Sequence, residues 1–168
     1  MKIYKLIITT TLLVFTLNLF ADTGDTIIIN PITWDTASPE GWNAQYKVQV
    51  EFPPAAKAND WGKIIMVQTR KCDEATKGDK YACGEWDYIW HTKVNIAKGD
   101  TVEPFCIGSF VTPYGKRLYL GGEEGWSWYY DMTDYAPILT DNKELIVGNN
   151  QELLDLKFLF IQGTPTRN

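Results

Sequence analysis

Strict alternation of apolar and polar side chains is the feature that most constrains the fold. In residues 45–52 every second side chain is apolar, beginning at Tyr46 and ending at Phe52, while Lys, Gln and Glu occupy the positions between them. A period of two places the apolar side chains on one face of a β-strand, where they can cover a core. No segment repeats apolar residues at helical spacing over three turns. The sequence therefore predicts a protein built from strands.

Segments of the same kind recur along the chain, separated by turns rich in Gly, Pro and Asn. The expected strands are residues 26–29, 45–52, 64–69, 85–96, 102–112, 126–132, 145–147 and 154–161. Asn30 and Pro31 are expected to end the first strand, and one helical turn is expected to start at Thr133. About eight short strands in one domain predict an all-β fold, a jelly-roll β-sandwich of antiparallel strands.

The N-terminus carries a different pattern. Lysines precede an apolar run at residues 6–20, and the small residue Ala21 follows the run. This order is typical of a secretory signal peptide. The run is shorter than the roughly 20 apolar residues that a spanning helix needs. We therefore expect residues 1–21 to be a signal peptide, residues 22–168 to form one domain, and the protein to be secreted or periplasmic without a membrane anchor.

The sequence argues against nucleic-acid binding, metal binding and catalysis by a nucleophilic triad. A formal net charge of −5 without a basic patch argues against nucleic acid as a partner. The single histidine, His91, excludes a histidine-built copper site and gives little support to a nucleophilic triad. The cysteines and the histidine are not spaced as zinc ligands. No metal and no organic cofactor is expected.

Three cysteines remain after export, so at most one pair can form within the chain. Cys72 and Cys83 bracket a polar loop without apolar periodicity, and a disulfide between them is the preferred pairing. In a chain-entropy model, closing such a loop contributes about 2–3 kcal/mol. Cys106 lies in an apolar strand-like run and is expected to be a buried free thiol.

Two acidic residues follow Cys83 directly. If residues 85–96 form a strand, Glu85 and Asp87 share its polar face, roughly 7 Å apart, while Trp86 and Trp90 face the core. A carboxylate in a partly desolvated cleft can act as a general base on water. The alternative is that both acids lie on an ordinary solvated face.

A second aromatic cluster allows two interpretations. Trp126, Trp128, Tyr129 and Tyr130 lie close together in one expected strand. Aromatic rings could stack on sugars, but alternation would instead bury Trp126, Trp128 and Tyr130 on one face. Alternation favours the core for these three side chains.

Four motifs, in this order, resemble the peptide-N-glycosidase F family. They are Cys-Gly-Glu-Trp-Asp-Tyr at 83–88, Ile-Gly-Ser-Phe-Val-Thr-Pro-Tyr at 107–114, Asp-Met-Thr-Asp-Tyr at 131–135 and Phe-Ile-Gln-Gly-Thr-Pro at 160–165. Members of this family are secreted bacterial amidases that remove whole N-linked glycans from asparagine. The match covers most of residues 45–165 and corresponds to the first of the family's two jelly-roll domains.

The resemblance implies roles for individual residues. The essential aspartate of the family falls on Asp87, which would polarise or deprotonate the attacking water. Trp86 corresponds to a residue that lines the sugar site. Glu85 and Tyr88 would contact substrate beside it, although Tyr88 stands where a well-known member has arginine. A second functional glutamate of the family aligns with Asn150.

The implied reaction is hydrolysis of the amide that links N-acetylglucosamine to asparagine in N-glycoproteins, without a cofactor. Cys72 and Cys83 correspond to the family's cysteine pair, and Glu152 lies near the Asn150 position. In the family, another functional acid belongs to a second domain. The resemblance therefore implies that this chain carries part of a site, which a second jelly-roll domain or a partner chain would complete. The alternative is a non-catalytic glycan-binding or scaffolding domain of a truncated protein.

Overall fold

The computed structural model describes residues 24–41, 44–73, 89–111, 125–148 and 152–164. These residues form β1 (Thr26–Ile32), β2 (Gln45–Glu51), η1 (Ala55–Lys57), β3 (Trp61–Cys72), β4 (Ile89–Lys98), β5 (Thr101–Val111), β6 (Trp126–Asp131), η2 (Thr133–Tyr135), β7 (Asn142–Gly148) and β8 (Glu152–Gln162). The elements η1 and η2 are short 3₁₀ turns. In these ranges no helix is long and apolar enough to cross a membrane.

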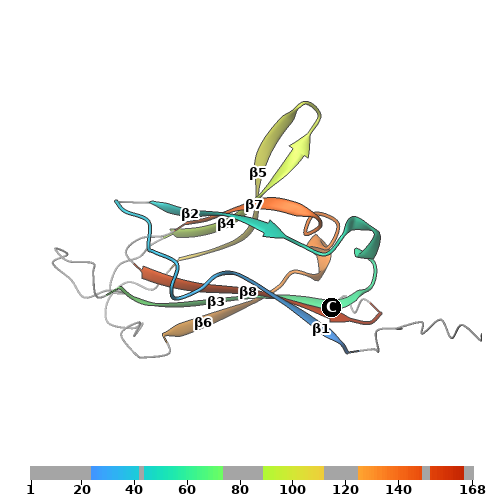
Figure 1. Ribbon diagram of the computed structural model, residues 1–168, viewed down its shortest axis with the longest axis horizontal. Helices are drawn as coiled ribbons and strands as arrows, with labels where there is room; N and C mark the ends of the chain where they lie inside the picture. Colours follow the sequence, from blue (N-terminus) through green and yellow to red (C-terminus); the bar gives the residue numbers. More distant parts are fainter. Residues whose placement is uncertain (1–23, 42–43, 74–88, 112–124, 149–151, 165–168) are drawn as a thin grey trace, which may run out of the picture.

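The strands form two four-stranded sheets, with the orders β1-β8-β3-β6 and β2-β7-β4-β5. All the pairings within them are antiparallel. Figure 1 shows the sheets as two layers of a sandwich, with the turn of the β4–β5 hairpin projecting beyond them. Apart from this hairpin, strands that follow one another along the chain belong to opposite sheets. The expected all-β sandwich of the jelly-roll kind is confirmed.

Large apolar side chains from both sheets meet between the layers. Leu156, Phe158 and Phe160 of β8 are fully buried, as the alternation of this segment predicts. Phe158 packs edge-on against Phe52, with ring centroids 5.2 Å apart. Trp61 packs in the same way against Phe160, also at 5.2 Å. Edge-to-face packing suits the quadrupoles of aromatic rings and adds to the stabilisation from burial.

The first strand does not end at Asn30 and Pro31 but continues to Ile32, so the expected end is wrong. A register shift between Ile29 and Ile32 accommodates the proline, which cannot donate a hydrogen bond to the ladder. β1 is an edge strand that pairs only with β8 within the described part of the chain. The turn expected at Thr133 is confirmed as η2.

Cys106 is a free cysteine, but it is exposed, so the expected burial of its thiol is wrong. The ladder between β4 and β5 shifts its register between Thr92 and Lys93. Next to this shift the neighbouring Ile107 takes the inward position and is only 3% exposed. The Sγ atom of Cys106 instead lies outside the core, 3.9 Å from Nδ1 of His91.

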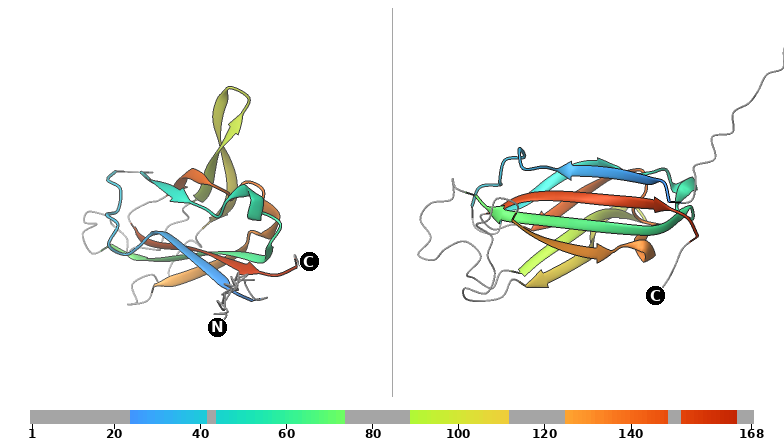
Figure 2. Two further views of the ribbon diagram at one scale, coloured as in Figure 1. Left: turned by 45° about the vertical axis from the view of Figure 1, so that its right-hand side comes forward. Right: turned by 90° about the horizontal axis from the view of Figure 1, so that it is seen from below.

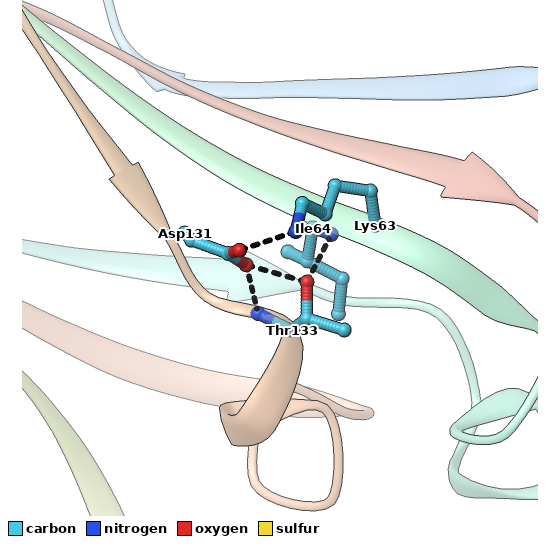
Figure 3. Close-up of polar contacts among 4 residues, drawn as sticks. All are labelled: Lys63, Ile64, Asp131 and Thr133. Atoms are coloured by element: carbon cyan, nitrogen blue, oxygen red, sulfur yellow. Dashed lines mark hydrogen bonds and ion pairs between the residues drawn. The ribbon is translucent and has the colours of Figure 1, made fainter. Parts of the chain in front are cut away.

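A polar clasp of Lys63, Ile64, Asp131 and Thr133 ties the end of β6 to β3 (Figure 3). Asp131 forms an ion pair with Lys63 at 2.5 Å and accepts a hydrogen bond from the Thr133 amide at 3.0 Å. The Ile64 amide donates to the Thr133 hydroxyl at 3.1 Å. Burial alone would raise the pKa of Asp131, but these contacts with Lys63 and Thr133 outweigh it and lower the pKa.

The core makes a first prediction about stability. Phe158→Ala removes a fully buried ring and leaves a cavity, so we expect it to lower the free energy of unfolding by about 3–5 kcal/mol. Tyr129→Ala is the matched control, because this side chain is 71% exposed, and it should change stability by about 0.5 kcal/mol or less. Urea denaturation measures both; equal losses would contradict this packing.

Candidate functional site

One end of the sandwich, called here the loop end, carries most of the long connections. There β3 ends at Cys72 beside Glu152, the first residue of β8. In the other sheet β4 begins at Ile89 beside Val111, the last residue of β5. Three connections begin or end at these strand ends: residues 74–88 between β3 and β4, residues 112–124 between β5 and β6, and residues 149–151 between β7 and β8.

Most of the site residues expected from the sequence belong to these connections and lie outside the described residues. They are Cys83, Glu85, Trp86, Asp87, Tyr88 and Asn150. Cys72 is the exception and forms the end of β3. The pairing of Cys72 with Cys83 and the roles of Asp87 and its neighbours therefore stay predictions. What the structure describes is the set of strand ends that flank these residues in the chain, called here the platform.

The centre of this platform is Arg70, whose side chain is fully buried between the two sheets. Its guanidinium carbon lies 3.3 Å from the ring centroid of Trp90 and 3.8 Å from that of Phe110. These two rings are nearly parallel, with an interplanar angle of 7°. The guanidinium from β3 thus stacks between aromatic rings of β4 and β5, an arrangement that suits a planar cation.

A third ring extends the stack. Trp128 of β6 lies 4.7 Å from Phe110 between ring centroids, and 4.8 Å from the guanidinium carbon of Arg70. Just before β6, the backbone of Gly125 comes very close to the backbone of Arg70. Its backbone has a φ of 66°, and a Cβ there would lie only 2.1 Å from the carbonyl oxygen of Arg70.

Polar neighbours complete the surroundings of the cation. Nη2 of Arg70 donates to Oε1 of Gln68 at 3.1 Å, and Gln68 in turn donates to the Thr92 hydroxyl. All three side chains are buried. Nε and Nη1 of Arg70 find no hydrogen-bond acceptor among the described residues. Buried donors of this kind are rare in proteins and often mark functional or strained places.

Glu152 supplies the opposite charge. Its side chain is fully buried at the start of β8. Burial raises the pKa of the Glu152 carboxyl to about 7, and the positive charge of Arg70 opposes this rise. Burial lowers the pKa of Arg70, and the charge of Glu152 opposes that shift. Arginine nevertheless keeps its proton in folded proteins, so Glu152 carries the titration of the pair.

The burial of Glu152 bears on the acid that the family places at Asn150. A side chain with no exposed surface does not present its carboxylate to a large sugar substrate. Glu152 instead lies beneath the loop end, two positions after Asn150 in the chain. Its position suits it to hold the loop end through Arg70 rather than to contact a ligand.

Arg70 and Glu152 were not among the site residues expected from the sequence, yet a signal for both is present. Ile64, Met66 and Gln68 alternate inward along β3, and Arg70 continues the same phase. Glu152 precedes the inward series that begins with Leu154 in the same way. A charged residue in phase with an apolar face indicates a buried charge.

The aromatic residues of β6 are distributed between exposed and buried positions differently from the expectation. Trp126 is 49% exposed, so its predicted place in the core is wrong. Trp128 and Tyr130 are half-buried and pack against Phe110. The reason is that β6 is an edge strand of its sheet, and Trp126 begins it, where the opposite sheet covers less of its surface.

Two of the four motifs that resemble the family have structural roles. Asp131 and Thr133 of the 131–135 motif form the clasp of Figure 3. In the 160–165 motif, the Gly163 amide donates to the Asp60 carbonyl oxygen at 3.0 Å, next to the backbone of Gly62. These two motifs hold the sandwich together, and the described part of the 107–114 motif belongs to β5. The 83–88 motif is the one to which the sequence assigns candidate chemistry.

Comparisons with known proteins agree with this fold. No family model and no curated protein sequence matches the chain. Among solved structures, PNGase F, a glycosylasparaginase from Flavobacterium meningosepticum, matches 84% of this chain over 43% of its own length, with a TM-score of 0.59 and 24% identity. The chain has the fold of part of PNGase F.

A second structure, recombinant peptide:N-glycanase F (PNGase F), matches 86% of this chain and 43% of that chain, with a TM-score of 0.61 and 23% identity. The resemblance that the four motifs carry is thus confirmed as a shared fold. The chain spans less than half of the length of these PNGase F structures.

The pKa of Glu152 predicts how stability depends on pH. Because the folded state holds this proton more tightly than the unfolded state, ionisation of Glu152 lowers stability as the pH rises from the ordinary pKa of 4.5 to about 7. Below this window the contribution is fully present, and above it the contribution is lost. We expect Glu152→Gln to remove this decline. The difference in unfolding free energy between the two proteins, measured by urea titration at several pH values, isolates the effect; a constant difference would contradict it.

Arg70 and Glu152 should also be energetically coupled. Arg70→Met removes the positive charge that opposes the rise in the Glu152 pKa, so we expect this pKa to rise further and stability above pH 7 to fall. Adding Glu152→Gln should restore part of this loss, because no buried charge then remains. Lys47→Met, at an exposed position of β2, is the control and should change little. Strictly additive losses in the double variant would show that the two side chains do not interact.

Proposed function

We propose that this chain is the N-terminal jelly-roll domain of an exported amidase of the peptide-N-glycosidase F kind. Its substrate would be an N-glycoprotein, and its reaction the hydrolysis of the amide between N-acetylglucosamine and asparagine. The predicted signal peptide at residues 1–21 supports export to the periplasm or the medium. The PNGase F fold supports the choice of substrate class.

One observation carries this proposal. The 83–88 motif directly precedes β4, in the connection that leaves β3 at the loop end of a sandwich with the PNGase F fold. Connections at one end of a rigid sheet scaffold are where binding and catalytic residues concentrate. The described strands on both sides of the motif are fixed by Arg70, Trp90 and Phe110.

In the proposed reaction, Asp87 takes a proton from water as the water attacks the amide carbonyl carbon of the glycosylated asparagine. The bond between that carbon and the glycosylamine nitrogen then breaks, and the nitrogen receives a proton. The products are an aspartate on the peptide and a glycosylamine. Trp86 would stack on the sugar, while Glu85, Tyr88 and Asn150 would contact it. A second jelly-roll domain or chain would supply the remaining acid.

Binding and hydrolysis test different parts of the proposal. We expect an N-glycopeptide to bind the chain and Trp86→Ala to weaken binding by about tenfold, since stacking on an aromatic ring contributes 1 kcal/mol or more. Asp87→Asn should abolish conversion of the glycosylated asparagine to aspartate, followed by mass spectrometry. Asp100→Asn, in the turn between β4 and β5, is the control and should change neither.

The outcomes separate the candidates. Hydrolysis that persists in Asp87→Asn would remove Asp87 from its role. Saturable glycan binding without any hydrolysis, also when a second domain is supplied, would replace the amidase by the glycan-binding or scaffolding domain. Absence of binding by isothermal titration calorimetry would contradict both.

A further inference from the structure

We propose that the edge of β1 opposite β8, which no described strand pairs with, and the pocket beside it bind an extended basic peptide segment by β-strand addition. This site lies at the other end of the sandwich from the loop end. Thr26 of β1 pairs with Ile161, near the end of β8, whereas Glu152 at the loop end begins β8. The inference is therefore independent of the amidase proposal.

The first observation is the edge itself. β1 pairs with β8 on one side and with no described strand on the other. An edge strand presents backbone N–H and C=O groups that a further strand can bind. Residues 27–29 of this edge are three consecutive isoleucines, and the side chains of Ile27 and Ile28 are 47% and 63% exposed. Proteins usually protect such edges with lysine or with a short strand. Figure 2 shows β1 along the border of its sheet, over β2 of the other layer.

The second observation is a pocket of about 570 Å³ next to this edge. Ile27 and Ile29, two alternate side chains of β1, form one wall. The floor contains Phe52 and Trp61, which are 2% and 4% exposed. A strand added to β1 would place every second side chain on the pocket's side of the sheet. The pocket thus gives the side-chain selectivity that main-chain pairing lacks.

Charge decides which occupant fits. Asp25 and Glu51 are exposed carboxylate residues that line the pocket. The lining lysine, Lys57, forms an ion pair with Asp60 at 3.6 Å, so its charge is partly offset. The whole chain has a formal net charge of −5. Two copies of this acidic chain would repel each other, whereas lysine or arginine beside an apolar side chain complements the pocket.

The probe is an acetylated, fluorescein-labelled peptide of sequence Lys-Ile-Lys-Ile-Lys-Ile, and the readout is fluorescence anisotropy with the purified chain. We expect saturable binding that weakens about tenfold in Ile27→Lys, because this change removes an apolar wall of the pocket. Ile28→Lys is the matched control. It adds the same charge to the same strand on the opposite face, and affinity should stay within about twofold. Thermal unfolding confirms that both variants fold.

Two altered peptides test the mode of binding. Replacing lysine by glutamate should abolish binding, because the residues around the pocket are acidic. N-methylation of alternate peptide nitrogens on the pairing edge should also abolish it, because main-chain hydrogen bonds are lost.

The proposal is wrong if the lysine peptide does not bind, if N-methylation leaves the affinity unchanged, or if Ile27→Lys and Ile28→Lys act equally. Sedimentation velocity provides the remaining comparison. A dimer of the chain that Ile27→Lys abolishes would assign the edge to a second copy and would also overturn the proposal.

Discussion

The contact on which the loop end depends is the stack of the Arg70 guanidinium between Trp90 and Phe110. In the far half of the sandwich, Phe52, Phe158 and Trp61 make apolar ring contacts. At the loop end a cation bridges the layers instead. A planar cation between two rings fixes both the distance and the relative orientation of the sheets. Aliphatic side chains at the same place would constrain the orientation less.

Burying two opposite charges, such as those of Arg70 and Glu152, is seldom a source of net stability, because desolvation of both charges offsets their attraction. Here the two charged residues have a positional role that apolar residues would not have. Arg70 and Glu152 lie within two positions of the strand ends from which residues 74–88 and 149–151 depart. The stacking of Arg70 on Trp90 and Phe110 is directional, and it fixes the strand ends at this place. A site that needs its residues held closely benefits from such a rigid base.

Much of the sandwich follows from local rules, and its exceptions have local causes. Alternation from Leu154 to Phe160 predicted β8 and its buried face correctly, because alternate side chains of a strand lie on the same face and that face is covered by the core. The exposure of Cys106 was not predicted because a register shift at Ile107, in its own strand β5, changed which residues point inward. The exposure of Trp126 was not predicted because alternation does not distinguish an edge strand from a central strand.

The cluster around Arg70 could not be predicted from the sequence. Arg70 lay beyond the expected end of its strand, and the rings that it contacts come from the other sheet. Asp87 and its neighbours remain predictions from their motif.

The order of the strands has a consequence for how the molecule is made. Thr26 near the start of the described chain pairs with Ile161 near its end, and β2 pairs with β7. Neither sheet can close until β7 and β8 have left the ribosome. Folds dominated by such distant pairings fold slowly, since the chain must lose conformational entropy before the stabilising contacts form. Until these strands pair, the edges of their partners stay open to other chains, which is the stage at which such folds are most prone to aggregate.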